Sequence, residues 1–303
     1  MPEVILRTTN LGKAFRSRWA VKDLNLEVHR GDIFGFLGPN GAGKSTSIRM
    51  MFSLIRPTVG SVEIFGHRVD KNKKDALMKV AGIVERPDFY LYLSAYNNMK
   101  IAGALTLGKY PTKENILKNL KIVGLEHRAN DKVKTFSHGM KQRLGIAQSL
   151  LTNPELIVLD EPTNGLDPQG VRDVRELIKK LSSENGITVF LSSHILSEVE
   201  LVATRMAIIN KGELVAQGKV KELLAIKEPG IILDAKPIQK VKQILNKKFN
   251  ISEVKIINNK FNFKTKKELI PEITKQLVLN KCTVNEISQK NSLEDYFLSI
   301  TQK

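Results

Sequence analysis

Eight consecutive residues near the start of the chain have the spacing of a phosphate-binding loop. They are Gly38, Pro39, Asn40, Gly41, Ala42, Gly43, Lys44 and Ser45, which match the pattern G-x-x-x-x-G-K-[ST]. Glycines let the backbone curl so that several N–H groups face phosphate oxygens, and Lys44 adds a positive charge there. The Ser45 hydroxyl is suited to Mg²⁺, and Thr46 opens the helix that follows. The loop therefore predicts binding of ATP together with Mg²⁺.

Two adjacent acids follow a second apolar run. Residues 156–159 read Leu-Ile-Val-Leu and end in Asp160 and Glu161. A buried strand that delivers Asp160 beside Ser45 would complete the shell of the magnesium ion. Glu161 would then be placed to polarise the attacking water as a general base. A pair of acids at a strand end can also be a solvated exit from the sheet, but the upstream phosphate loop favours the catalytic interpretation.

A third segment places a serine before an amphipathic helix that is expected to run to about Leu151. Residues 136–140 read Phe-Ser-His-Gly-Met, and Ser137 is a good residue to cap such a helix. The same geometry presents the hydroxyl, free N–H groups and the helix dipole to an anion. Capping and phosphate binding by Ser137 and Gly139 both follow from this pattern.

The order of these three segments resembles the ATP-binding cassette (ABC) ATPase family, whose signature is Leu-Ser-Gly-Gly-Gln. This chain keeps Ser137 and Gly139 and departs from that signature at His138 and Met140. The resemblance covers residues 1–220. It implies an ATPase that powers a separate membrane permease, and it adds Ser137 and Gly139 to the residues expected to bind ATP.

Further segments resemble the family in order. Residues 164–167, Asn-Gly-Leu-Asp, look like the D-loop, although an ordinary turn before a proline is the alternative. His194 follows a predicted strand and looks like the switch histidine, which the resemblance makes a catalytic partner of Glu161. Phe15 resembles the aromatic residue that stacks on adenine; Trp19 is a second candidate, and either could be plain core.

Glu85 stands where the family usually has glutamine. A glutamine would be a neutral ligand for Mg²⁺ or water, whereas Glu85 brings a full negative charge. A glutamate at this position, followed by Pro-Asp-Phe-Tyr over residues 87–90, resembles the bacitracin- and lantibiotic-resistance branch of ABC exporters. Glu85 is therefore a candidate metal ligand, and a tolerated substitution is the equal alternative.

The elements that must position these residues follow from the periodicity of apolar side chains. We expect strands over residues 33–37, 156–159 and 187–191, with helices over 46–54 and 170–181. These alternating strands and helices predict an α/β domain. The resemblance implies that this domain is a P-loop NTPase core of the ABC type.

Other segments predict additions to that core. A hairpin is expected over residues 206–216, with a turn at Lys211-Gly212, and a helical subdomain is expected over about 86–152. The predicted nucleotide-binding domain spans 1–225, and a small C-terminal α+β domain spans 230–303. The latter should contain helices over 238–247 and 268–279 and strands over 253–257 and 261–264, while residues 292–298 look like the closing segment of exporter subunits.

Composition limits the setting of the chain. The 303 residues are 42% hydrophobic and 26% charged, which is typical of globular domains and excludes fibrous or disordered architectures. No apolar run approaches the ~18 residues needed to cross a bilayer, and no secretory signal is evident. The single cysteine, Cys282, fits a reducing compartment. With the resemblance, these features predict a peripheral protein on the cytoplasmic face of the cell membrane.

The net charge of +17 could attract anionic lipid or nucleic acid, or could simply be a solvated surface. A soluble ABC ATPase acting on nucleic acid is the main alternative, but such relatives carry two cassettes or a long coiled coil. A binding module with a dead site is disfavoured because Lys44, Asp160, Glu161 and His194 are all present.

One phosphate loop and one signature imply that a second ATPase subunit completes each site. The partners expected from the resemblance are a homodimer or a paired ABC ATPase, and a membrane-embedded permease that docks around residues 85–98. No nucleic-acid partner is expected. Export is favoured by Glu85 and by the short C-terminal domain, while the transported substrate is not encoded in this chain.

Overall fold

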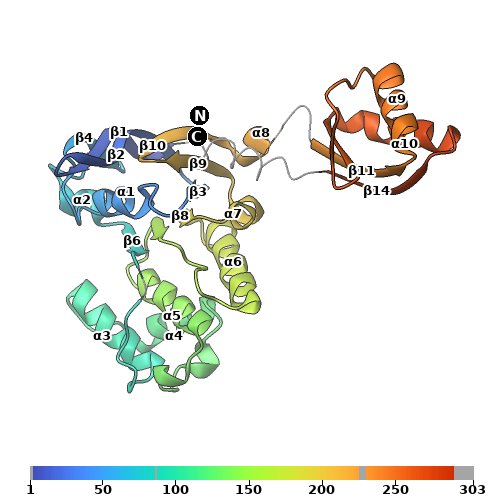
Figure 1. Cartoon of the computed structure of the whole chain (residues 1–303). Helices are drawn as coiled ribbons and strands as arrows, with labels where there is room; N and C mark the ends of the chain where they lie inside the picture. Colours follow the sequence, from blue (N-terminus) through green and yellow to red (C-terminus); the bar gives the residue numbers. More distant parts are fainter. Residues whose placement is uncertain (1–2, 86, 225–229, 290–303) are drawn as a thin grey trace. The chain divides into compact units, whose positions relative to one another are not determined.

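The computed structural model describes residues 3–85, 87–224 and 230–289, and it divides into two compact units, Met1–Val220 and Lys221–Lys303 (Figure 1). Each unit is described by itself. Residues 292–298, expected to form a closing segment, lie outside the described residues. The domain limits 1–225 and 230–303 stay a prediction, since residues 225–229 are not among those described either.

The first unit contains two sheets and a set of helices. Its strands are β1 (Val4–Phe15), β2 (Arg18–His29), β3 (Ile33–Leu37), β4 (Val59–Ile64), β5 (His67–Arg68), β6 (Val80–Ile83), β7 (Leu156–Leu159), β8 (Thr188–Ser193), β9 (Arg205–Asn210) and β10 (Glu213–Lys219). Its helices are α1 (Lys44–Met51), α2 (Lys73–Leu77), α3 (Ala95–Leu107), α4 (Lys113–Ile122), α5 (His138–Leu150), α6 (Pro168–Ser183) and α7 (Leu196–Val202), and α8 (Val220–Leu224) follows β10.

A mixed sheet in the order β10-β9-β3-β8-β7-β6 carries the site at the carboxyl ends of its strands. The strands β9, β3, β8, β7 and β6 run parallel, and β10 pairs antiparallel with β9. Every residue of β3, β7 and β8 is buried, as expected for parallel strands covered on both faces. The predicted strands at 33–37 and 156–159 are confirmed, and the third begins at Thr188 rather than Ile187.

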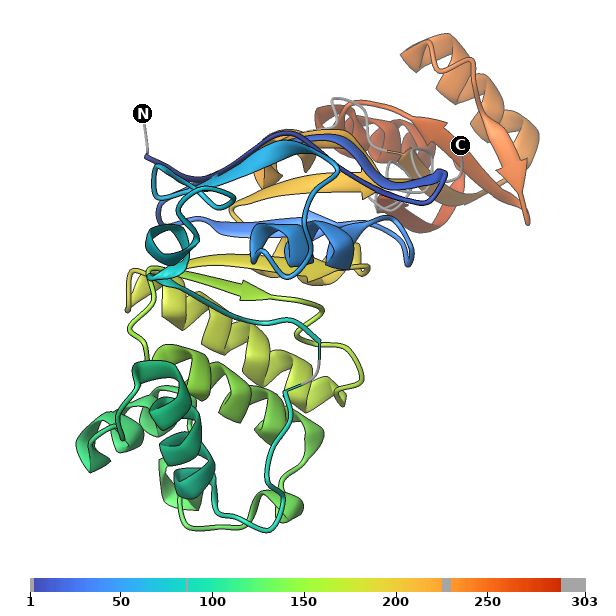
Figure 2. The ribbon, with the colours of Figure 1, turned by 90° about the vertical axis from the view of Figure 1, so that its left-hand side faces the viewer.

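An antiparallel sheet in the order β2-β1-β4-β5 lies on the other side of α1 (Figure 2). Ile48 and Met51 of α1 belong to the same buried core as Leu6 of β1 and Phe34 of β3, so this helix joins the two sheets. The apolar pattern of β1 and β2 is broken by polar residues and by register shifts, which is why no sheet was predicted there.

The helix after the phosphate loop begins and ends earlier than predicted. It spans Lys44–Met51 instead of 46–54, because Gly43 already has the left-handed conformation that starts it and Ser53 has a left-handed backbone (φ 54°) that ends it. The early start is significant, because it places Lys44 and Ser45 in the first turn.

Helices α3, α4 and α5 form the helical segment between β6 and β7, as the sequence predicts. Ser94, Thr112 and Ser137 cap them, each accepting a hydrogen bond from a backbone N–H in the first turn. The segment packs internally and against α6. These contacts fix the position of the start of α5.

A charged cluster ties three strands together at the end of the sheet remote from Asp160. Glu155, just before β7, pairs with Arg30 and with Lys79, which precedes β6. Hydrogen bonds from Lys79 and then Arg30 hold the pKa of Glu155 below its usual range. Glu155 therefore fastens the amino end of the central strands.

The second unit is an α+β sandwich of one sheet and two helices. Its elements are β11 (Gly230–Lys236), α9 (Ile238–Phe249), β12 (Lys255–Ile257), β13 (Lys260–Lys264), α10 (Ile270–Leu279) and β14 (Thr283–Gln289). The strand order β12-β13-β11-β14, all antiparallel, gives the β-α-β-β-α-β arrangement called ferredoxin-like.

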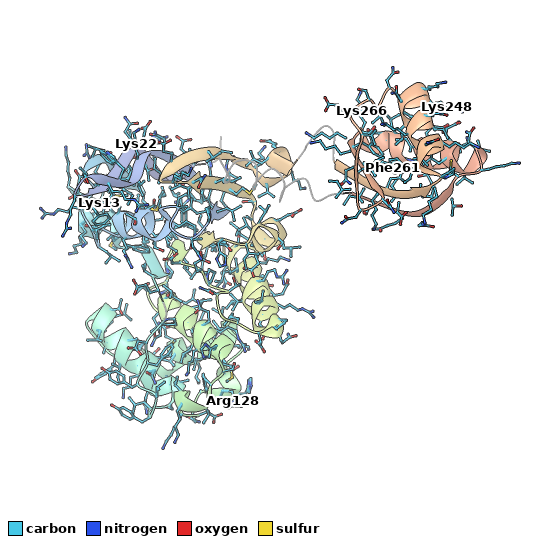
Figure 3. The ribbon with its side chains drawn as sticks, viewed as in Figure 1. Lys13, Lys22, Arg128, Lys248, Phe261 and Lys266 are labelled. Atoms are coloured by element: carbon cyan, nitrogen blue, oxygen red, sulfur yellow. The ribbon has the colours of Figure 1, made fainter. Side chains whose placement is uncertain are left out.

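Phe261 lies between the sheet and the helices of this unit (Figure 3). Leu233, Leu245 and Leu277 share its core, so the unit has an apolar interior of its own. The predicted α+β character is confirmed. The second helix begins at Ile270, later than expected, because Lys267–Leu269 forms a 3₁₀ turn first.

Candidate functional site

The phosphate loop leaves β3 and curls into α1. Its glycines at 38 and 43 are required sterically, because a Cβ at Gly38 would stand 2.4 Å from the Ile209 carbonyl oxygen and Gly43 has φ 107°. Gly43 carries no side chain that could cap α1, so the N–H groups of the first turn stay directed at the loop. The loop thus offers backbone donors and the positive end of a helix to an anion.

Lys44 lies inside this loop and reaches the acid pair. Its side chain is only 6% exposed, and its Nζ donates to the Gly38 carbonyl at 2.8 Å. The same Nζ lies 3.1 Å from Oε1 of Glu161, which follows Asp160 after β7. Two segments separated by more than a hundred residues therefore meet, as the sequence predicts.

His194 contacts the other oxygen of the same carboxylate. Its Nδ1 lies 2.7 Å from Glu161 Oε2, so Glu161 is held between a lysine and a histidine. The backbone of Glu161 is left-handed (φ 48°), a conformation that costs a residue with a side chain about 1–2 kcal/mol. Its neighbours must supply that energy.

Ser192 supplies part of it, and the sequence analysis missed this residue. Ser192 is fully buried in β8, donates to Asp160 Oδ1 at 2.6 Å and accepts from the Glu161 backbone N–H at 2.9 Å. The signal in the sequence was a hydroxyl at a fully buried strand position, which must find a partner. Ser192 fixes the orientation of both acids.

The side-chain oxygens of Ser45 and Asp160 are suited to bind Mg²⁺. Among residues 3–85, 87–224 and 230–289, no group of three His, Cys, Asp or Glu side chains is placed to hold a metal ion alone. Mg²⁺ in nucleotide sites needs no such group, since it takes one or two protein oxygens and completes its shell with phosphate and water. The Ser45 hydroxyl and the buried Asp160 carboxylate are hard oxygen ligands of this kind.

Ser137 and Gly139 open α5 as expected. The Met140 N–H donates to Ser137 Oγ at 3.2 Å, so Ser137 is a helix cap in this structure. Gly139 packs closely on Gly170 near the start of α6, where Asp167 caps that helix by accepting from the Gly170 N–H at 3.0 Å. The starts of α5 and α6, and with them the signature and D-loop segments, therefore lie side by side.

Glu85 contacts α1. Its carboxylate forms an ion pair with Arg49, which lies one helical turn after Ser45. Its backbone is left-handed (φ 76°) and its side chain is 65% exposed. The structure thus places Glu85 beside the helix that carries Ser45, with a cation that the sequence analysis did not anticipate.

The loop after Glu85 packs against α5. A Cβ at Gly145, near the middle of that helix, would stand 2.8 Å from the Pro87 Cβ. Glycine at this position lets the loop and the helix approach closely.

Phe15 ends β1 with its ring 52% exposed, and Trp19 follows at 42%. The hairpin that carries both reaches the phosphate loop, because a Cβ at Gly43 would meet the Ala20 carbonyl oxygen at 2.6 Å. Lys13 lies over the Phe15 ring at 5.3 Å from its centroid. Phe15 is thus an exposed aromatic on the hairpin whose Ala20 reaches the phosphate loop.

Taken together, the loop, the acid pair and the histidine define a nucleoside triphosphate site on a P-loop fold. The sequence model described as ABC transporter matches residues 21–164. The chain is 42% identical over 299 residues to the bacitracin transport ATP-binding protein BcrA of Bacillus licheniformis, covering 98% of this chain and 97% of that protein. It is 40% identical to the uncharacterized ABC transporter ATP-binding protein YhcH of Bacillus subtilis (strain 168), covering 99% and 96%.

Among solved structures, the chain resembles the dimeric ATP-binding cassette MJ0796 bound to ADP and Pi. The TM-score is 0.63 at 27% identity, and the match covers 71% of this chain and 99% of that chain. This chain belongs to the ABC transporter ATP-binding protein family. It is the ATP-binding and ATP-hydrolysing subunit of a transporter, as the sequence predicts. No helix in the described part of the chain combines the length and apolar character needed to cross a bilayer.

Proposed function

We propose that this subunit pairs head to tail with a second ATPase subunit and sandwiches two ATP–Mg²⁺ between them. The observation that carries the proposal is Glu161, whose carboxylate contacts both Lys44 and His194. Each chain has one phosphate loop and one signature segment, so the Ser137 end of α5 would complete the partner's site. The similarity to a dimeric cassette supports this arrangement.

Each residue has a role in hydrolysis under this proposal. Lys44 and the N–H groups of the loop bind the β- and γ-phosphates. Glu161 accepts the proton of the attacking water, and His194 orients Glu161. Ser45 and Asp160 would hold Mg²⁺, which would neutralise phosphate charge, and Glu85 is a further candidate ligand. Phe15 stacks on adenine.

A separate membrane permease would dock on the groove between β6, the loop at Pro87 and helices α3 and α5. Ala102, Thr106 and Gln148 line this groove, whose volume is ≈ 390 Å³. Tyr90, Tyr92 and Leu105 expose apolar surface on the neighbouring loop and on α3. A groove lined by both polar and apolar side chains, with apolar surface beside it, fits a short amphipathic permease helix. Docking would keep the subunit peripheral, on the cytoplasmic face.

Export is the proposed direction of transport. BcrA, a bacitracin transport protein, matches this chain over nearly its whole length. The second unit of this chain is covered by that match. No nucleic-acid partner is proposed.

The test is Glu161→Gln in the purified full chain. We expect ATP binding to persist, turnover to fall at least about 100-fold and an ATP-dependent dimer to accumulate in size-exclusion chromatography. Glu155→Gln, at the other end of β7, is the matched control and should hydrolyse ATP normally. Undiminished turnover in Glu161→Gln would exclude Glu161 as the base.

A further inference from the structure

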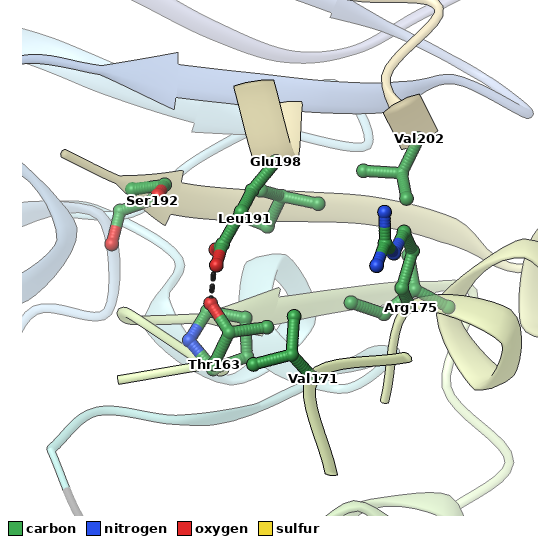
Figure 4. A pocket seen from close by; sticks show the side chains of 10 residues that line it. Thr163, Val171, Arg175, Leu191, Ser192, Glu198 and Val202 are labelled. Atoms are coloured by element: carbon green, nitrogen blue, oxygen red, sulfur yellow. Dashed lines mark hydrogen bonds between the residues drawn. The ribbon is translucent and has the colours of Figure 1, made fainter. Parts of the chain in front are cut away.

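The residues on both sides of Glu161 are held by one later stretch of the chain, which comprises the end of β8 and the helix α7. On the amino side, Ser192 donates to Asp160 and accepts from the Glu161 N–H. On the carboxyl side, the Thr163 hydroxyl donates to a carboxylate oxygen of Glu198 in α7 (Figure 4). The two contacts bracket the four residues from Asp160 to Thr163.

The Ser192 contact with Asp160 is buried, and the Thr163–Glu198 contact is partly buried. Ser192 is fully buried in a strand whose residues are all buried. The Thr163–Glu198 contact borders a cavity of ≈ 20 Å³ lined by Val171, Leu191 and other residues, which has room for about one water molecule. Hydrogen bonds in such surroundings are stronger than in water and resist exchange.

The bracketed segment needs such support. Glu161 has a left-handed backbone, and Pro162 after it is buried. A residue with a side chain keeps this conformation only where the surrounding structure imposes it. The neighbouring His194 lies between Ser192 and Glu198 in sequence, so one stretch of chain contacts the Glu161 side chain and secures the backbone on both sides of it.

We propose that Ser192 and Glu198 are positioning residues for ATP hydrolysis. Ser192 orients the Asp160 carboxylate and the Glu161 backbone, and Glu198 holds Thr163. Together they keep the Glu161 carboxylate in contact with His194 and Lys44. The inference rests on the proposed role of Glu161 as the base. It assigns no contact with the nucleotide to either residue.

The first experiment removes the Ser192 hydroxyl from the full chain. Ser192→Ala should lower kcat about 10- to 100-fold, because small displacements of a catalytic group have effects of this size. It should also raise the Mg²⁺ concentration at half-maximal turnover, since Asp160 loses its hydrogen bond. The affinity for a fluorescent ATP analogue should change less than about threefold.

The matched control is Thr188→Val in the same strand. Thr188 is also fully buried, and its hydroxyl accepts from the Gly31 N–H at the end of β8 away from the site. Thr188→Val should lower the melting temperature about as much as Ser192→Ala and leave kcat and the Mg²⁺ dependence unchanged. A kcat of Ser192→Ala within about twofold of that control would overturn the proposal for Ser192.

The second experiment tests the contact on the carboxyl side of Glu161, between Thr163 and Glu198. Glu198→Ala should lower kcat about tenfold, whereas Glu200→Ala, two residues along the same helix and exposed, should not. Equal rates for the two variants would overturn the proposal for Glu198.

A double variant separates this inference from the function beneath it. At saturating Mg²⁺, which removes the effect through Asp160, adding Ser192→Ala to Glu161→Gln should reduce the residual turnover less than about twofold, because both changes then disable the same base. Full additivity would mean that Ser192 acts independently of Glu161 and would overturn the inference. If Glu161→Gln alone retains turnover, the base assignment itself fails, which is a different result.

Discussion

Lys44 Nζ and Glu161 Oε1 are 3.1 Å apart, so the cation of the phosphate loop is neutralised by the candidate base. Under the proposed function, an arriving γ-phosphate would compete with Glu161 for Lys44, and the carboxylate would then be free to activate water. The pair would in this way link nucleotide binding to release of the proposed base.

Replacing Lys44 should weaken nucleotide binding itself. Lys44→Ala removes a charge-assisted contact to phosphate, and we expect the affinity for ATP to fall at least about tenfold. Equilibrium binding of a fluorescent ATP analogue measures this change. The control is Lys22→Ala, which should bind ATP normally. Lys22 is an exposed lysine of β2 that pairs with Glu213 of β10. Equal affinities for the two variants would exclude Lys44 from phosphate binding.

His194 should affect turnover and leave binding intact. Its ring contacts Glu161 at 2.7 Å, and loss of an acid–base partner typically costs about 10²–10⁴ in rate. We therefore expect His194→Ala to lose most of its ATPase rate while its ATP affinity stays near that of the wild type. His67→Ala, an exposed histidine in β5, provides a comparison that should retain full rate. A His194→Ala variant with normal turnover would show that the contact is structural.

Arg49 and Glu85 should behave as a pair in kinetics. Their side chains are 41% and 65% exposed, so the ion pair contributes no more than about 1 kcal/mol to stability. Arg49→Gln leaves the negative charge of Glu85 uncompensated one turn from Ser45, which should raise the KM for ATP. The double variant Arg49→Gln/Glu85→Gln should restore it. If the two single effects simply add, the pair has no joint role.

Glu155 should make stability depend on pH in the acid range. Because Lys79 and Arg30 hold its pKa below 4.5, its stabilising contribution is complete above about pH 4.5. The contribution is lost as the pH falls through the lowered pKa of the folded state. The difference in melting temperature between wild type and Glu155→Gln should therefore be constant near neutral pH and shrink below pH 4.5. A difference that grows on acidification would contradict this assignment.

The second unit should unfold without the first. Phe261 is fully buried in a core that contains only residues of that unit. Phe261→Ala should cost about 3–5 kcal/mol there, enough to unfold a small domain. Limited proteolysis should then remove the C-terminal unit, while the remaining fragment keeps its ATP affinity. Loss of ATP binding together with the C-terminal unit would contradict independent folding.

Local pattern was sufficient for the elements that carry the chemistry. Strands β3 and β7 are continuous apolar runs, and the glycines at 38, 41 and 43 define their loop without any distant contact. Strands β1 and β11 were not predicted. Register shifts break the alternation of β1, and in β11 Ile232 occupies a position on the less buried face, where alternation predicts a polar residue. The apolar face of such strands is recognisable only once their partners are known.

The contacts around the site depend on strand order, which a single sequence does not state. Ser192 meets Asp160 because β8 lies beside β7, and Arg49 meets Glu85 because β6 ends near α1. Each pair is far apart along the chain. Sequence reasoning thus found the residues that are expected to touch the nucleotide, and it missed the residues that hold them in position.

Gly145 determines how closely the Pro87 loop is coupled to the signature segment at the start of α5. Its missing side chain lets the Pro87 loop rest directly on α5, whose first turn begins after Ser137. Because the loop and the helix are in direct contact, a displacement of the loop would be passed on to the helix. The added methyl group of Gly145→Ala would force the Pro87 loop and α5 apart. It would thereby shift the signature segment, although neither Pro87 nor the signature segment itself is changed.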